Sequence, residues 1–195
     1  MWLGCRIVVS SLPGFRLKTV RLIDVEDNHA VVGRSCCEEN RVSVFDFRFT
    51  VNAPLAAVSA FHFEPGILKT LTPPLMIMQV HRFDPLANGS IGEFTMWMGP
   101  VPVRWKAEHS NVSERSFTDT QVAGPMKSWV HTHTFSAIDD NTTEVHEHIE
   151  FEHFGGLKGL WSRLLFPKPA LFALFNIRKM ITRREVARRL ESADS

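Results

Sequence analysis

The chain has 195 residues, of which 44% are hydrophobic and 22% are charged, and this composition is typical of one globular domain with a sizeable core. Its 22 basic and 21 acidic side chains leave a formal net charge of +1, which excludes a strong overall attraction to nucleic acid or to an anionic membrane. The three cysteines lack the spacing of a zinc site or a disulfide framework, and no stretch predicts a secretory signal or a transmembrane segment, so we expect a cytoplasmic protein.

The first forty residues differ from the rest because they carry no sustained hydrophobic periodicity. We predict residues 1–40 as a poorly ordered N-terminal extension and one domain over residues 41–195. The domain begins with a strand in which Phe45, Phe47 and Phe49 alternate with mostly polar neighbours. Two short helices, the second stopped by a pair of prolines, are predicted next at residues 55–63 and 67–71.

Six further strand-like runs follow, and the turn residues between them are typical of an antiparallel meander. A helical pattern then starts near Leu157, and we expect Pro169 to break it before a long final segment. The predicted fold is α+β: a curved antiparallel sheet of about seven strands that buries one face against a long C-terminal helix. The six runs are residues 76–83, 91–98, 103–112, 116–122, 128–137 and 143–151.

Several of these runs place ionisable and aromatic side chains on the same face, because alternate residues of a strand point the same way. A plain core does not need Asp119 or the two histidines of the next run, and a solvent face does not need the aromatic residues beside them. The pattern therefore predicts a cavity lined by the sheet. Its predicted ligand-binding residues are Trp105, Phe117, Asp119, Gln121, Trp129, His131, His133, Glu147 and Phe151.

The chemistry of this face has three interpretations. A histidine beside a carboxylate can relay protons near pH 7, as a cyclase or dehydratase requires. The same buried groups can instead satisfy one another and shape the cavity floor. His131 and His133 could also ligate a metal, but no spacing fixes the remaining ligands. We predict a binding site without metal or cofactor, and we assign no residue a catalytic role.

The final helical segment is apolar at first and strongly basic afterwards. A helix dipole favours cations only near the C-terminal end of the helix, so it does not account for all of them. Such a surface could dock an acidic partner or membrane headgroups, and the alternative is an ordinary solvated face. The cations are Arg178, Lys179, Arg183, Arg184, Arg188 and Arg189.

Three stretches carry a recognisable pattern over roughly residues 41–190: FTVNAPLAAVSAFHFEPGILKTLTPP (49–74), WKAEHSNVSERSFTDTQVAGPMKSWVHTHTF (105–135) and TEVHEHIEF (143–151). They resemble the START-like (SRPBCC) superfamily, in particular its polyketide cyclase/dehydrase-like ligand-binding group. The resemblance implies a helix-grip fold with a hydrophobic cavity between sheet and helix. Glu147 and Phe151 stand where this group leads us to expect Asp and Tyr, so a hydroxyl contact from the second position is absent.

The sequence thus predicts a protein that binds a hydrophobic, aromatic or lipid-like small molecule and no nucleic acid. A cyclase or dehydratase that uses the Asp, His and Glu side chains for acid–base chemistry is the alternative. An interaction module that acts through the basic helix is a further alternative.

Overall fold

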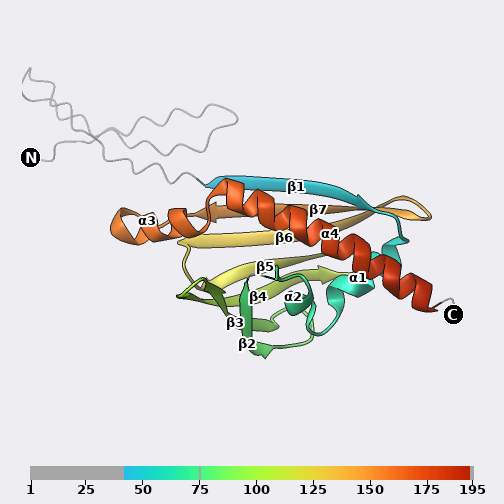
Figure 1. Cartoon of the computed structure of the whole chain (residues 1–195), viewed down its shortest axis with the longest axis horizontal. Helices are drawn as coiled ribbons and strands as arrows, with labels where there is room; N and C mark the ends of the chain where they lie inside the picture. Colours follow the sequence, from blue (N-terminus) through green and yellow to red (C-terminus); the bar gives the residue numbers. More distant parts are fainter. Residues whose placement is uncertain (1–41, 75, 194–195) are drawn as a thin grey trace, which may run out of the picture. The chain divides into compact units, whose positions relative to one another are not determined.

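The computed structural model describes residues 42–74 and 76–193, which form one seven-stranded antiparallel sheet and four helices (Figure 1). The predicted extension, residues 1–40, lies outside the described residues. Across the sheet the strands follow the order β1-β7-β6-β5-β4-β3-β2, so the first strand pairs with the last and the others form a meander. The strands are β1 (Ser43–Val51), β2 (Ile77–Phe83), β3 (Ile91–Met98), β4 (Val101–Ser113), β5 (Ser116–Ala123), β6 (Ser128–Asp139) and β7 (Thr142–Glu152).

The alternation of large apolar residues explains why β1 has one buried and one exposed face. Phe45, Phe47 and Phe49 are buried, whereas Asp46 and Arg48 between them are exposed. The later strands end within two residues of their predicted ends, because turn residues interrupt the period-two pattern sharply. The predicted α+β architecture is therefore confirmed.

Irregular pairing accompanies the curvature of the sheet. The register of β4 against β5 shifts between Lys106 and Ala107 and again between Ser110 and Ser113. Asn111, inside the second shift, has a φ of 53°, a left-handed conformation that asparagine tolerates better than most residues. Such bulges increase the local twist and bend a strand, so they help the sheet to wrap around a helix.

Two short helices, α1 (Leu55–Phe63) and α2 (Ile67–Thr70), follow β1 as predicted. Pro54 is the N-cap residue of helix α1. A proline suits this position because a backbone N–H there would have no partner within the helix. Gly66 precedes α2 with a φ of 87°, a left-handed conformation that suits glycine. Helix α1 contacts β6, β7 and α4, so it closes one end of the space beneath the sheet.

The C-terminal region forms two helices, α3 (Gly156–Leu165) and α4 (Lys168–Ala193), and the break between them is not where it was predicted. It lies at Phe166 and Pro167, whereas Pro169 sits in the first turn of α4. A proline is tolerated in a first turn because the N–H it lacks would have no helical partner. Within the described part of the chain, no helix is long and apolar enough to cross a membrane.

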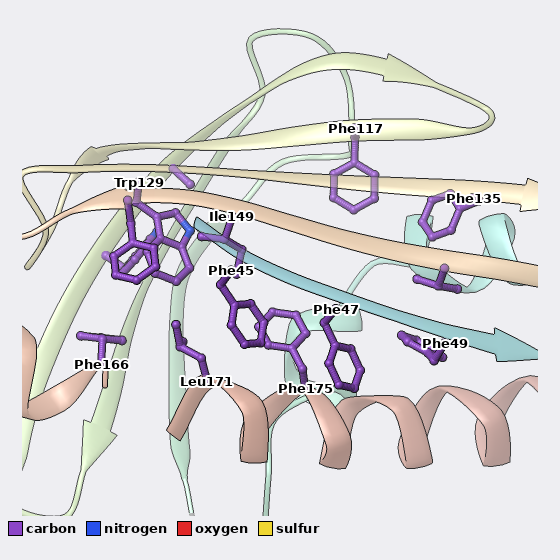
Figure 2. Close-up of a cluster of buried hydrophobic side chains, with 14 of the residues drawn as sticks. Phe45, Phe47, Phe49, Phe117, Trp129, Phe135, Ile149, Phe166, Leu171 and Phe175 are labelled. Carbon is purple, nitrogen blue, oxygen red and sulfur yellow. The ribbon is translucent and has the colours of Figure 1, made fainter. Parts of the chain in front are cut away.

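The core lies between the sheet and α4 (Figure 2). The phenylalanines of β1 point toward α4, and Leu171 and Phe175 of α4 point back toward the sheet. The ring centroid of Phe175 lies 5.3 Å from that of Phe45 and 5.9 Å from that of Phe47. A helix that presents such an apolar face to a curved sheet positions everything that lies beneath that sheet.

We expect Phe175→Ala to lower the free energy of unfolding by about 3–5 kcal/mol, because it empties space at the centre of this core. Phe172→Ala, one turn earlier on α4, is the matched control, since Phe172 is 58% exposed and Phe175 only 2%. The control should cost roughly 1 kcal/mol or less. Urea denaturation measures both, and equal losses would contradict this account of how α4 is held.

Candidate functional site

A cavity of about 150 Å³ lies between the sheet and the helices α1, α2 and α4. Most of its wall is apolar, and ionisable side chains from β4, β5 and β6 share one part of it. The apolar lining comprises Phe63, Ile67, Leu68, Leu71, Phe83, Leu86, Gly92, Phe94, Met96, Trp105, Ala107, Phe117, Trp129, Leu171, Leu174 and Phe175. The ionisable lining comprises His62, Glu64, His109, Asp119, His131, His133 and Arg178.

Most of the predicted ligand-binding residues reach this cavity, and three do not line it. Glu147 lies behind the wall, where it contacts two of the histidines. Gln121 instead donates from Nε2 to the carbonyl oxygen of Met126 at 2.8 Å, so it holds the turn between β5 and β6. Phe151 is fully buried beside Trp129. The residues that do line it are Trp105, Phe117, Asp119, Trp129, His131 and His133.

Four ionisable residues of the cavity, His62, Glu64, His109 and Arg178, were not predicted as part of the site. His109 shares the face of Trp105 on β4, so its parity on that strand could have indicated it. His62 lies on α1, where its Nδ1 donates to the carbonyl oxygen of Val58 at 2.7 Å, and no sequence signal distinguishes it from an ordinary helix residue. Arg178 was assigned to the basic surface of the last helix.

Asp119 of β5 is held by histidines from both neighbouring strands. Its Oδ2 accepts a hydrogen bond from Nε2 of His133 at 3.1 Å, and its Oδ1 lies 3.0 Å from Nε2 of His109. The other ring nitrogen of His109 lies 3.1 Å from the carbonyl oxygen of Ser90, to which it can donate. Both nitrogens of His109 therefore face acceptors, which suits an imidazolium.

Glu147 of β7 links the two histidines of β6. Its Oε2 accepts a hydrogen bond from Nε2 of His131 at 2.7 Å and lies 2.7 Å from Nδ1 of His133. The register explains this contact, because His133 pairs directly with Glu147 across the two strands. The ring of His133 therefore lies between two carboxylates, those of Asp119 and Glu147, and the cluster spans β4 to β7.

The carboxylates determine the charge of His133. Burial alone disfavours its charged form, but the negative charge of Glu147 and the hydrogen bond to Asp119 overcome this and raise the pKa of His133 to about 9. Burial also opposes ionisation of both acids, yet their histidine partners lower the pKa of Asp119 and of Glu147 below the usual range. At pH 7 the centre of the cluster is therefore an imidazolium between two carboxylates.

His131 is neutral beside this charged centre. Burial, and the positive charge on His133, lower the pKa of His131 to about 4 despite its hydrogen bond to Glu147. Because Nε2 donates to the ionised carboxylate, the lone pair of the neutral ring lies on Nδ1. His131 can thus accept a proton or a hydrogen bond, and it stands in the cavity wall.

The cations of α4 do not form one surface. Arg178 lines the cavity, and Arg183 donates from Nε to the carbonyl oxygen of Thr50 at 2.7 Å. Arg189 donates to both carboxylate oxygens of Glu64, at 2.8 Å and 2.7 Å. Three of the six cations of the basic stretch therefore have separate surroundings, whereas Arg184 is exposed.

Among the described residues, two groups of side chains each bring three possible metal ligands together. In the cavity, an ion would compete with histidine protons for the same carboxylate, so its binding would weaken as the pH falls. On the outer face, both imidazoles already lie 2.8 Å from one carboxylate oxygen. The groups are Asp119, His131 and His133 in the cavity, and Asp46, His146 and His148 outside.

No family model matches the chain, and no curated protein matches it by sequence. Solved structures do match. The aromatase/cyclase Zhui from Streptomyces sp. R1128 has a TM-score of 0.59 at 16% identity, and the match covers 78% of this chain and 98% of that one. Norcoclaurine synthase from Thalictrum flavum has a TM-score of 0.52 at 16% identity, with 72% and 87% covered. The major latex-like protein 151 from Panax ginseng has a TM-score of 0.56 at 14% identity, with 74% and 97% covered.

Identities this low show a common fold and no more. The strand order, the two short helices after β1 and the long helix beneath the sheet are those of a helix-grip fold. The fold implied by the sequence resemblance is thus confirmed.

The histidines predict a free energy of unfolding that is largest near neutral pH. His133 has a folded-state pKa of about 9, above the unfolded value, so its contribution of about 3 kcal/mol is complete below pH 6.5 and is lost as the pH rises through 9. The folded-state pKa values of His62 and His131 are both about 4, so stability is also lost as the pH falls from 6.5 toward 4.

Urea denaturation across pH 4 to 10 measures this profile. His133→Gln should flatten the alkaline limb, whereas His148→Gln, on the outer face, should leave most of it in place. If both variants lost stability equally steeply at alkaline pH, the charged cluster would not be the origin of this loss.

Proposed function

We propose that the chain binds a small hydrophobic or aromatic molecule in the cavity between the sheet and α4. One observation carries the proposal: an unfilled space of about 150 Å³ lies within an aromatic core and beside a cluster of charged groups. Protein interiors are normally close-packed, so a space of this kind costs contacts that a ligand can supply. A mainly apolar pocket with a few convergent polar groups is the usual form of a small-molecule site.

The volume favours a ligand, or a ligand portion, of about one ring. An engineered apolar cavity of roughly this size binds benzene, whereas sites for larger ligands usually measure about 300–1,000 Å³. The solved norcoclaurine synthase is a complex with dopamine and hydroxybenzaldehyde, two single-ring molecules. Edges and faces of Trp105, Phe117 and Trp129 offer such a ring stacking partners. A lipid chain would first have to widen the cavity.

The polar cluster supports binding more strongly than catalysis. His133 has a carboxylate beside each ring nitrogen, and His109 has an acceptor beside each of its own. Nδ1 of His133 lies 2.7 Å from Glu147 without hydrogen-bonding geometry, so this contact is an ion pair alone. A ligand that exchanged a proton with either ring would have to displace one of these contacts. The cluster thus resembles a buried network whose members satisfy one another and fix one wall of the cavity.

A second function is favoured by His131 alone. Its neutral ring is oriented by Glu147 through Nε2 and could accept a proton at Nδ1, as a cyclase or dehydratase of the aromatase/cyclase type would require. The two functions differ in the fate of the bound molecule. Native mass spectrometry of freshly purified protein identifies a retained ligand, and a binder releases it unchanged after incubation. Conversion that stops in His131→Gln would establish the enzyme instead.

We expect Ala107→Leu to weaken binding of a neutral single-ring probe, para-fluorobenzamide, by at least about ten-fold, because the added carbons occupy space in the cavity. Ala137→Leu makes the same change at an exposed position on β6 and should leave the affinity unchanged. A fluorine NMR titration measures both, with thermal unfolding to check that each variant is folded. Equal affinity in wild type and Ala107→Leu would place the probe outside the cavity and defeat the proposal.

A further inference from the structure

We infer that the ligand of this cavity is an organic anion whose acidic group contacts Arg178, an inference that rests on the proposed function. Arg178 lies on α4 and lines the cavity. Its Nε is buried and has no hydrogen-bond partner among the residues that the structure describes. The guanidinium carbon lies 5.4 Å from the ring centroid of Phe175, so one side of the group faces an aromatic ring.

The other charges around the cavity already have partners. Asp119 lies between His109 and His133, and Glu147 contacts both His131 and His133. Glu64, the remaining carboxylate of the lining, is paired with Arg189 at 2.7 Å. His62 is neutral at pH 7, since burial lowers its pKa to about 4. Within residues 42–74 and 76–193, Arg178 is thus the cavity cation that no carboxylate contacts, and the charges of Glu147 and Asp119 act on it only from a distance.

An unpaired guanidinium cannot relieve this situation by losing its proton. Burial lowers the pKa of Arg178, but an arginine side chain stays protonated in proteins. Arg178 is half-buried, and its Nε is buried without a partner, which is costly. A planar fork of N–H donors matches a carboxylate in particular. A ring of the size that fits the cavity, carrying a carboxylate, would fill the space and neutralise the charge together.

Two compounds of nearly the same size and shape, one an anion and the other neutral, test this inference: para-fluorobenzoate and para-fluorobenzamide. Wild type should bind the acid at least about ten-fold more tightly than the amide, as expected for a charge-assisted contact in a desolvated site. Arg178→Met should remove this preference and keep the affinity for the amide. Arg184→Met, an exposed change on the same helix, should keep the preference. Fluorine NMR titrations measure each affinity.

The outcomes distinguish the contact with Arg178 from binding in the cavity itself. If the acid preference survives in Arg178→Met, or wild type prefers the amide, the anion contact is overturned and the aromatic cavity remains. If neither compound binds, the proposed function and this inference both fail. Without ligand, Arg178→Met should also have a higher Tm than wild type, because a half-buried charge and its buried, unpartnered Nε are gone. A lower Tm would show that the guanidinium has a stabilising role within the folded chain and would count against the inference.

A different observation, independent of the cavity, concerns α3. Four large apolar side chains of this helix are between 61% and 83% exposed, and their spacing at i, i+3, i+4 and i+7 places them on one face. They are Leu157, Leu160, Trp161 and Leu164. A contiguous exposed apolar face of this kind is unusual on a protein surface and marks an interaction site.

The charges of α3 indicate what this face contacts. The helix carries Lys158 and Arg163 and has no acidic residue, and Lys168 follows at the start of α4. All three are exposed. A short helix with an apolar face that includes a tryptophan, flanked by cations alone, has the features of a segment that lies in the interface of an anionic membrane. We propose that α3 docks the domain on such a surface.

Co-sedimentation of the full chain with vesicles tests the membrane contact. The protein should bind vesicles that contain phosphatidylglycerol and should bind phosphatidylcholine vesicles much more weakly. Leu160→Ser/Leu164→Ser and Lys158→Glu/Arg163→Glu should each abolish binding. Val122→Ser/Ile138→Ser, which removes two other exposed apolar side chains, should not.

Three results would overturn this second proposal. The first is no binding to anionic vesicles. The second is binding that both α3 variants retain. The third is a dimer, detected by analytical ultracentrifugation, that Leu160→Ser/Leu164→Ser dissociates, because the apolar face would then belong to a contact between two copies of the chain.

Discussion

The structure depends on the ion contacts that bring an imidazolium between two carboxylates inside the sheet. Asp119, His133 and Glu147 come from three neighbouring strands, and each would be costly to bury alone. The imidazolium of His133 offsets the charge of one carboxylate, and His109 also contacts Asp119. These contacts need the register that sets His133 opposite Glu147 and diagonal to Asp119, whose direct partner on β6 is His131. A slip by one residue would turn these groups to the opposite face, so the cluster favours a single alignment of the central strands.

The same contacts gather the polar side chains on one part of the cavity wall. The charged groups face the space from β4, β5 and β6, whereas the helices contribute mainly apolar side chains and Phe175 contacts both the β1 rings and the ring of His131. Removing α4 would expose the cluster to water. Its pKa values would then return toward their usual range, because the shifts depend on burial as well as on contacts. The packing of α4 and the electrostatics of the site therefore depend on each other.

The sequence predicted the strands and most of the cluster because strand parity assigns side chains to a face. Parity predicts the face of the sheet on which a side chain lies, but not which partner it contacts there. It therefore placed Gln121 in the cavity, although this side chain hydrogen-bonds to Met126 at the turn. Helices offered less information. Arg178 belongs to a basic stretch, and only the rotation of α4 about its axis shows that this cation faces inward while Arg184 faces water. Pro169 was misjudged because a proline breaks a helix interior but is accepted in a first turn.

Two unfavourable features of the ligand-free domain coincide in space, and their coincidence is more informative than either alone. A void forfeits dispersion contacts, and an unpaired guanidinium forfeits solvation. An apolar side chain at position 178 would avoid the second loss, and the ring contacts that hold α4 against β1 are made by Phe175. A single molecule with a ring and an acidic group would remove both losses at once. The proposed ligand would in this way complete the core of the domain.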